Sequence, residues 1–96
     1  MCEFLRRQHG VRYYSLMPCN LYGIGDNYDV ENGHVLPTLI AKFVKAKEEG
    51  ADSVVLWGDG SPLREFLFSD DLADAVVRTF SIPDEKLPNL MNIGSS

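Results

Sequence analysis

The segment VRYYSLM at residues 11–17, followed by PCNLYGIGDNYDVENG at residues 18–33, decides the fold class of this chain. The first segment is rich in β-branched and aromatic residues, which predicts a strand ended by Pro18. The second is polar and contains Gly23, Gly25 and Gly33, which predicts a long loop over 19–33. A loop of this length is more often functional than a simple connection between two elements.

Helical and extended patterns alternate on both sides of this strand. The first half is expected to contain a helix over 1–9 ended by Gly10, the strand over 11–17, the loop over 19–33 and a helix over 35–49 ended by Gly50. A strand over 52–57, a turn over 58–62 and an extended segment over 64–68 are expected to follow. The last elements are a helix to about residue 80, capped by Ser69 or Asp70, and a final strand over 90–93. This alternation predicts an α/β chain.

Each of the two longer helices is expected to have one apolar face. These faces consist of Val35, Leu36, Leu39, Ile40, Phe43 and Val44 on the first helix, and of Leu72, Ala75, Val76 and Phe80 on the second. Few elements remain to cover both faces of a sheet in 96 residues. We therefore expect a piece of a larger fold, with apolar patches exposed on its helices.

Charge and cysteine content exclude several classes of function. The formal net charge of -5 provides no electrostatic footprint for nucleic acid or an anionic membrane. No apolar run is long enough to span a membrane. The spacing of Cys2 and Cys19 predicts neither a disulfide framework nor a metal site, so a reducing compartment, the cytoplasm, is expected.

Five side chains have chemistry that suits a ligand, and each also has an ordinary structural interpretation. Asn20 offers amide donors and an acceptor, or it ties down its own turn. His34 transfers protons near neutral pH, or it lies at the surface or caps the following helix. Trp57 stacks on a planar group, or it belongs to the core. Lys42 and Arg64 bind phosphate, or they are respectively a solvated lysine and the partner of a nearby carboxylate.

Three linked stretches resemble a known family when they are taken together. They are MPCNLYGIGDNYDVENGHVLPTLIAKF (17–43), VVLWGDGSPLREFLFSDDLADA (54–75) and NIGSS (92–96). They resemble the extended short-chain dehydrogenases of the NAD-dependent epimerase/dehydratase family, and within it most of all the GDP-L-fucose synthases. The resemblance implies a Rossmann-like α/β fold with part of the substrate-binding domain. It also implies NADP as cofactor and the NADPH-dependent epimerisation and reduction of GDP-4-keto-6-deoxy-D-mannose to GDP-L-fucose.

The resemblance implies roles for residues that match the family's motifs. On the cofactor side, Pro18, Cys19, Asn20 and Leu21 would line the nicotinamide end of the cofactor. His34 would lie near the cofactor and act as the catalytic acid in epimerisation. Cys19 stands where threonine is usual in the family, and it is not the family's catalytic cysteine.

On the substrate side, the resemblance implies that Lys42, Trp57 and Arg64 contact a GDP-sugar. Lys42 and Arg64 would offset phosphate charge, and Trp57 would pack against the nucleotide. Gly33 stands where serine commonly precedes the histidine, which affects the fine geometry of the loop and not the family.

Two motifs of the family do not occur in these 96 residues, namely the Gly-x-x-Gly-x-x-Gly loop and the Tyr-x-x-x-Lys pair. The pair protonates the carbonyl as hydride arrives, and the loop forms the adenosine end of the NADP site. We therefore expect one partial domain over residues 1–96 that lacks the dinucleotide-binding half and the C-terminal end. It is expected to be inactive alone, and its parent is expected to be a homodimer.

Two other functions remain open from the sequence. The first is a related nucleotide-sugar epimerase or dehydratase with a different nucleotide, against which the long loop before His34 argues. The second is a non-catalytic remnant or small binding module. The sequence that flanks residue 1 in the genome would decide between a fragment and a remnant.

Overall fold

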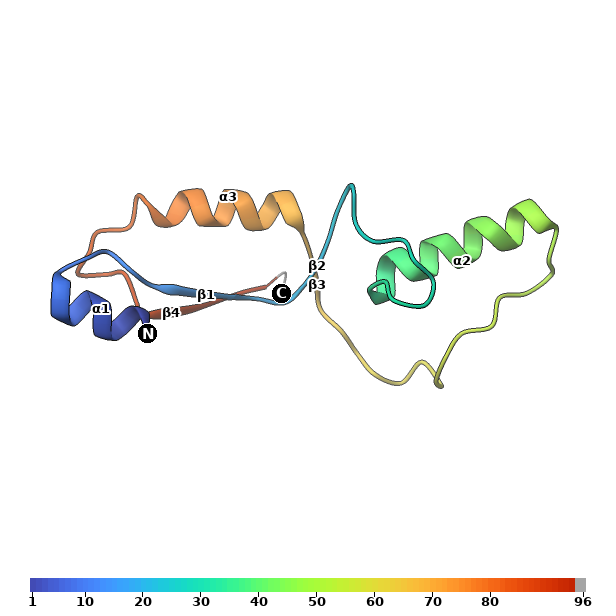
Figure 1. The fold of residues 1–96 in the computed structure, drawn as a ribbon, viewed down its shortest axis with the longest axis horizontal. Helices are drawn as coiled ribbons and strands as arrows, with labels where there is room; N and C mark the ends of the chain where they lie inside the picture. The colour runs from blue at the N-terminus through green and yellow to red at the C-terminus, as the bar shows by residue number, and fades with distance from the viewer. Residues whose placement is uncertain (95–96) are drawn as a thin grey trace. The chain divides into compact units, whose positions relative to one another are not determined.

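The computed structural model describes residues 1–94, so Ser95 and Ser96 at the end of the last motif lie outside the described residues (Figure 1). The chain divides into two compact units. One unit combines residues 1–21 with the chain from residue 65 onward, and the other consists of residues 22–64. Each unit is described by itself below.

A parallel strand pair forms the centre of the first unit. Strand β1 (Ser15–Pro18) pairs with β4 (Leu90–Ile93) in the register Ser15↔Leu90 to Pro18↔Ile93, and the two lie side by side in Figure 1. The final strand is confirmed, but the strand predicted over 11–17 is wrong in both bounds. A ladder exists only where a partner strand is present, and β4 reaches residues 15–18 alone.

The two helices of the first unit follow their local signals closely. Helix α1 (Cys2–His9) ends at Gly10, whose φ of 64° is left-handed, as expected for a C-terminal glycine. Helix α3 (Ser69–Thr79) carries Asp70 and Asp71 in its first turn, where negative charge is favourable. The predicted cap is wrong, because Phe68 occupies the N-cap position and no side chain caps the helix.

The buried residues of the first unit are few and do not follow the predicted stripe. Leu67 and Leu87 are its buried hydrophobic side chains, whereas Phe80 is 64% exposed. Thr79 is buried instead, although it is polar. Its Oγ1 donates to the carbonyl of Val76 at 2.6 Å and shares a hydrogen bond with the hydroxyl of Tyr14, which satisfies the buried group.

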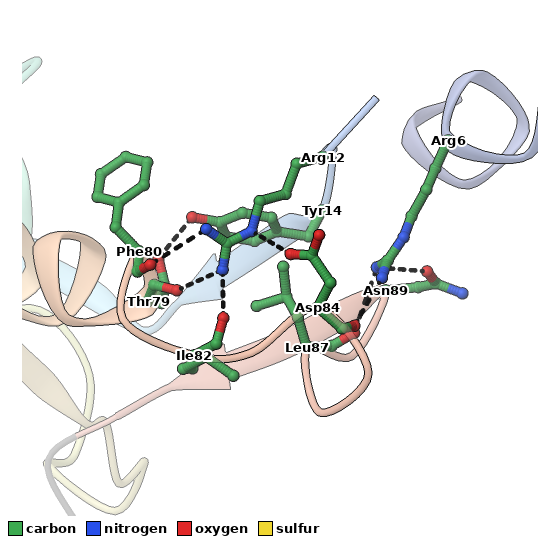
Figure 2. Close-up of polar contacts among 9 residues, drawn as sticks. All are labelled: Arg6, Arg12, Tyr14, Thr79, Phe80, Ile82, Asp84, Leu87 and Asn89. Atoms are coloured by element: carbon green, nitrogen blue, oxygen red, sulfur yellow. Dashed lines mark hydrogen bonds and ion pairs between the residues drawn. The ribbon is translucent and has the colours of Figure 1, made fainter. Parts of the chain in front are cut away.

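Two arginines hold the segment between α3 and β4, as Figure 2 shows. The guanidinium of Arg12 donates to the carbonyls of Thr79 at 3.2 Å and Phe80 at 3.1 Å, and also to that of Ile82. Its Nε forms an ion pair with Asp84 at 2.8 Å. Arg12 therefore binds carbonyls at the C-terminal end of α3, where a cation also favours the helix dipole.

Arg6 binds the later part of the same segment from α1. It donates to the carbonyls of Asp84 at 3.0 Å and Leu87 at 3.2 Å, and to Oδ1 of Asn89 at 3.4 Å. The backbone carbonyl of Asn89 in turn accepts from the N–H of Ser15 at 2.9 Å, next to the strand ladder. The two arginines thus fix the path along which the chain enters β4.

The second unit contains one long helix. Helix α2 (Val35–Glu49) begins and ends where the sequence predicts, and Gly50 closes it with a φ of 66°. Its apolar face is exposed as expected, at Val35, Ile40, Phe43 and Val44.

The strand predicted over 52–57 is wrong. Within the described residues this segment is irregular and mostly exposed, because a strand needs a partner ladder and these residues have none.

A second, short pairing lies in the stretch predicted as an unbroken loop. Strand β2 (Asn20–Tyr22) pairs with β3 (Phe66–Phe68). The extended segment predicted over 64–68 is thus confirmed in its second half, whereas the loop predicted over 19–33 begins only after Tyr22. Strands, helices and a parallel pair together confirm the α/β class.

Candidate functional site

The cofactor-side residues begin at the carboxyl end of the parallel pair. Pro18 is the last residue of β1 and lies opposite Ile93, the last residue of β4. The N–H of Cys19 then donates to the carbonyl of Ile93 at 3.0 Å, so the chain leaves the sheet at a fixed point. The carboxyl edge of an open α/β sheet is where ligands bind in this class of fold.

Asn20 and Leu21 continue from this edge into β2. Nδ2 of Asn20 donates to the carbonyl of Glu65 at 3.0 Å, and the side chain is otherwise exposed. The alternative that Asn20 ties down its own turn is wrong, because its partner lies 45 positions away along the chain. The amide oxygen Oδ1 is a further acceptor that suits a hydroxyl or amide of a ligand.

His34 occupies the N-cap position of α2, with extended backbone angles of φ -71° and ψ 163°. Its imidazole makes no capping hydrogen bond and the residue is exposed, so the interpretation as a side-chain cap is wrong and the interpretation as a surface residue is confirmed. Its carbonyl accepts from the N–H of Thr38 at 3.0 Å, which is the first hydrogen bond of the helix. An exposed imidazole with no capping role is available for proton transfer.

Lys42 and Trp57 are brought together, which the sequence did not predict. Nζ of Lys42 lies 5.2 Å from the centroid of the Trp57 ring, within the range of a cation–π interaction. Trp57 is 87% exposed, so the interpretation as a core tryptophan is wrong. An exposed indole beside an ammonium group combines a stacking surface with a positive charge, which suits a phosphorylated nucleotide.

Arg64 follows a tight turn that contains two left-handed glycines. Gly58 and Gly60 have φ values of 80° and 77°, and the carboxylate of Asp59 between them accepts from the N–H and hydroxyl of Ser61 at 3.0 and 2.7 Å. Asp59 is therefore engaged in its own turn. Nη1 of Arg64 donates to the carbonyl of Leu63 at 2.8 Å, and the residue is exposed. The guanidinium retains further donors for a phosphate.

The Asp59 turn carries a titration prediction. The backbone N–H of Ser61, followed by its hydroxyl, lowers the pKa of Asp59. Because the folded pKa is lowered, the stabilisation is present above the ordinary aspartate pKa and is lost as pH falls through the lowered value. We expect Ser61→Ala to raise the pKa of Asp59 only part of the way, since the N–H donor remains. A carbon-13 NMR titration of the carboxyl measures this, and an unchanged pKa would contradict it.

Sequence reasoning missed the residue that organises the loop before His34. The carboxylate of Asp29 accepts from the N–H groups of Glu31 and Asn32, both at 2.8 Å. These hydrogen bonds, that of Asn32 first, lower the pKa of Asp29. The available signal was an aspartate in a polar loop, which commonly hydrogen-bonds to the backbone two residues on.

The predicted site residues fall into two groups, one in each unit. Pro18, Cys19, Asn20 and Leu21 belong to the first unit, and His34, Lys42, Trp57 and Arg64 belong to the second. Within residues 1–94, no group of three or more histidine, cysteine, aspartate or glutamate side chains could hold a metal ion. No helix among these residues has the length and apolar character needed to cross a membrane.

The parallel pair and the helices that flank its strands along the chain define part of an α/β protein of the Rossmann-like class. Residues 1–94 match the NAD dependent epimerase/dehydratase family. The chain belongs to this family.

Relatives and a solved structure show the same resemblance. The chain is 42% identical to the GDP-L-fucose synthase of Azorhizobium caulinodans over 98% of its length and 30% of that protein. It is 60% identical to the probable GDP-L-fucose synthase 1 of Oryza sativa subsp. japonica over 80% of its length and 24% of that protein. The crystal structure of a GDP-L-fucose synthetase from Naegleria fowleri bound to NADP matches 98% of the chain and 30% of that protein, with a TM-score of 0.79 and 35% identity. The chain thus spans less than a third of each of these proteins.

Proposed function

We propose that this chain is the substrate-facing part of a GDP-L-fucose synthase. The supporting observation is its identity of 42% and 60% to two proteins of that name. The parent would use NADPH to epimerise and reduce GDP-4-keto-6-deoxy-D-mannose to GDP-L-fucose. The parent is also proposed to be a cytoplasmic homodimer, and residues 1–96 to be a partial domain of it.

On the cofactor side, the residues present fit the nicotinamide end of NADP. Pro18, Cys19, Asn20 and Leu21 follow the carboxyl end of a parallel pair, and the amide of Asn20 is anchored to the carbonyl of Glu65. When bound, NADPH supplies the hydride for the reduction. Asn20 would use Oδ1 to orient a donor of the ligand, while Cys19 is held to Ile93 through its backbone. The glycine-rich loop for the adenosine end is absent from these 96 residues.

On the substrate side, His34 is proposed to be the acid that protonates the enol carbon during epimerisation. Its exposure and its lack of a capping bond leave the imidazole available for this transfer. Trp57 would stack on the nucleotide, and Lys42 beside it and Arg64 would neutralise the diphosphate. These residues lie on one helix and on the loop that follows it in the sequence.

The isolated chain is expected to be inactive. It has no Tyr-x-x-x-Lys pair to protonate the carbonyl, so hydride transfer to the keto sugar would lack its proton. Purified chain mixed with NADPH and the keto sugar is expected to oxidise NADPH no faster than a protein-free control. Oxidation above that control that His34→Ala abolishes would overturn this part of the proposal.

The nucleotide preference tests the proposal against a related nucleotide-sugar epimerase or dehydratase. In a chimeric enzyme, this chain replaces the matching segment of the Azorhizobium caulinodans protein, which supplies the remaining parts. We expect the chimera to act on the GDP-linked keto sugar and not on UDP- or dTDP-linked sugars. A chimera that prefers another nucleotide would favour the related enzyme, and a folded chimera that turns over none of them would favour a non-catalytic remnant.

A further inference from the structure

The position of His34 depends on the backbone on either side of it. The residue has no side-chain hydrogen bond at the start of α2, so the imidazole is not anchored by its own atoms there. On the C-terminal side, the helix holds the carbonyl of His34 through the N–H of Thr38 at 3.0 Å. On the N-terminal side, a loop of irregular structure must provide the second constraint.

The carboxylate oxygen Oδ1 and the backbone carbonyl oxygen of Asp29 together supply that constraint. Its Oδ1 accepts from the N–H groups of Glu31 and Asn32 at 2.8 Å each, and from Nδ2 of Asn32 at 3.4 Å. Its backbone carbonyl accepts from the N–H of Gly33 at 2.8 Å and from Oγ1 of Thr38 at 3.3 Å. One residue thus binds the last three residues before His34 and the first turn of the helix after it.

The packing around Gly33 shows how closely the chain passes here. A Cβ atom built on Gly33 would lie 2.4 Å from the carbonyl oxygen of Asp29, 2.5 Å from that of Asn27 and 2.8 Å from Oγ1 of Thr38. Two of these three atoms are backbone, so the contact cannot be relieved by turning a side chain. The loop packs directly against Gly33, and a residue with a Cβ atom there would force the backbone of this loop to shift.

We propose that Asp29 is a positioning residue for His34, fixing where its imidazole lies through the hydrogen bonds to residues 31–33 and to Thr38. This inference rests on the proposed function, since it assigns Asp29 to the site in which His34 is the proton donor. Catalytic groups act only when they are held near their productive geometry by supporting hydrogen bonds. Asp29 provides such support while remaining outside the reaction itself.

The positioning role predicts how strongly each substitution in the loop disturbs His34. Asp29→Ala removes the side-chain acceptor of Glu31 and Asn32 and keeps the backbone acceptor of Gly33 and Thr38, so it is expected to release residues 31 and 32 and through them to loosen His34. Asp29→Asn keeps an oxygen of the same reach and is expected to retain the loop, whereas Asp29→Glu keeps the charge but displaces the oxygen by one methylene group. Asp26→Ala is the matched control, because Asp26 is an acidic residue of the same loop whose carboxylate, within the part of the chain that the structure describes, accepts from the N–H of Asn27 alone.

Two NMR measurements on the chain test the proposal. Amide exchange at Glu31 and Asn32, whose N–H groups donate to the Asp29 carboxylate, is expected to speed up by roughly threefold to tenfold in Asp29→Ala, the range for losing exposed hydrogen bonds to a charged acceptor. The imidazole signals of His34 are expected to broaden or shift in the same variant, to recover in Asp29→Asn, and to stay unchanged in Asp26→Ala. Signals of Tyr14 in the other unit report whether each variant remains folded there.

The outcomes separate this inference from the proposed function. Unchanged His34 signals in Asp29→Ala, or equal changes in Asp26→Ala, would overturn the positioning role. If Asp29→Ala unfolds α2, the His34 signals of Asp29→Asn and Asp29→Glu are compared instead. A loop that Asp29→Glu retains better than Asp29→Asn would overturn the positioning role. A chimeric enzyme that still epimerises with His34→Ala would instead overturn the role of His34 as proton donor, whatever the NMR results. A chimera that prefers another nucleotide would overturn the proposed function itself.

Discussion

Substitution of Arg12 by alanine is expected to destabilise the first unit by about 1.5–3 kcal/mol, the range for losing hydrogen bonds to a charged group. The side chain donates to carbonyls of Thr79, Phe80 and Ile82 and pairs with Asp84. When the guanidinium is removed, the carbonyls at the C-terminal end of α3 lose these donors. Urea unfolding followed by circular dichroism measures the change.

Two comparison variants make this result specific. Arg12→Lys keeps the charge but lacks the planar fork, so it is expected to recover only part of the loss. Arg7→Ala removes an exposed helix pair with Glu3, whose side chains are 74% and 44% exposed, and is expected to cost less than about 0.5 kcal/mol. Equal stability of Arg12→Ala and Arg7→Ala would contradict the role assigned to Arg12.

Substitution of His34 by alanine in the chimeric enzyme is expected to lower the epimerisation rate by about 100- to 10,000-fold, the range for losing a general acid. The readout is deuterium incorporation into the keto sugar in heavy water without NADPH, which reports epimerisation separately from reduction. The thermal midpoint is expected to remain unchanged, because the imidazole is exposed and makes no capping hydrogen bond. The loss would therefore be chemical and not structural.

His9 provides the control for this experiment. It is the other histidine of the chain and lies exposed in the last turn of α1. His9→Ala is expected to leave deuterium incorporation as it is in the unsubstituted chimera. Incorporation that survives in His34→Ala would show that another group supplies the proton.

Elements set by local signals could be predicted from the sequence. Helix α2 has both bounds as predicted, because its apolar spacing and the following Gly50 are properties of neighbouring residues. Elements that need a partner far away in the sequence could not be predicted in this way. The apolar run over 52–57 resembles a strand but has no ladder within residues 1–94, and β2 was hidden in a polar loop.

The same distinction applies to the site. The chemical type of His34, Trp57 and Lys42 could be read from the sequence, but not that the last two meet at 5.2 Å. Arg12 stands within an apolar run, and the carbonyls that it binds lie 67 to 70 positions further along. Nothing near it in the sequence indicates which carbonyls it binds, because that choice depends on how α3 ends.

The first unit joins the two ends of the chain, and this has a consequence for the order of folding. Arg6 and Leu87 are 81 positions apart, and within residues 1–94 the parallel partner of β1 is residues 90–93. Long loops must close before such contacts form, which slows folding. Within these residues, β1 and β4 can pair only after residues 22–64 have been made, whereas α2 can form earlier by local contacts alone.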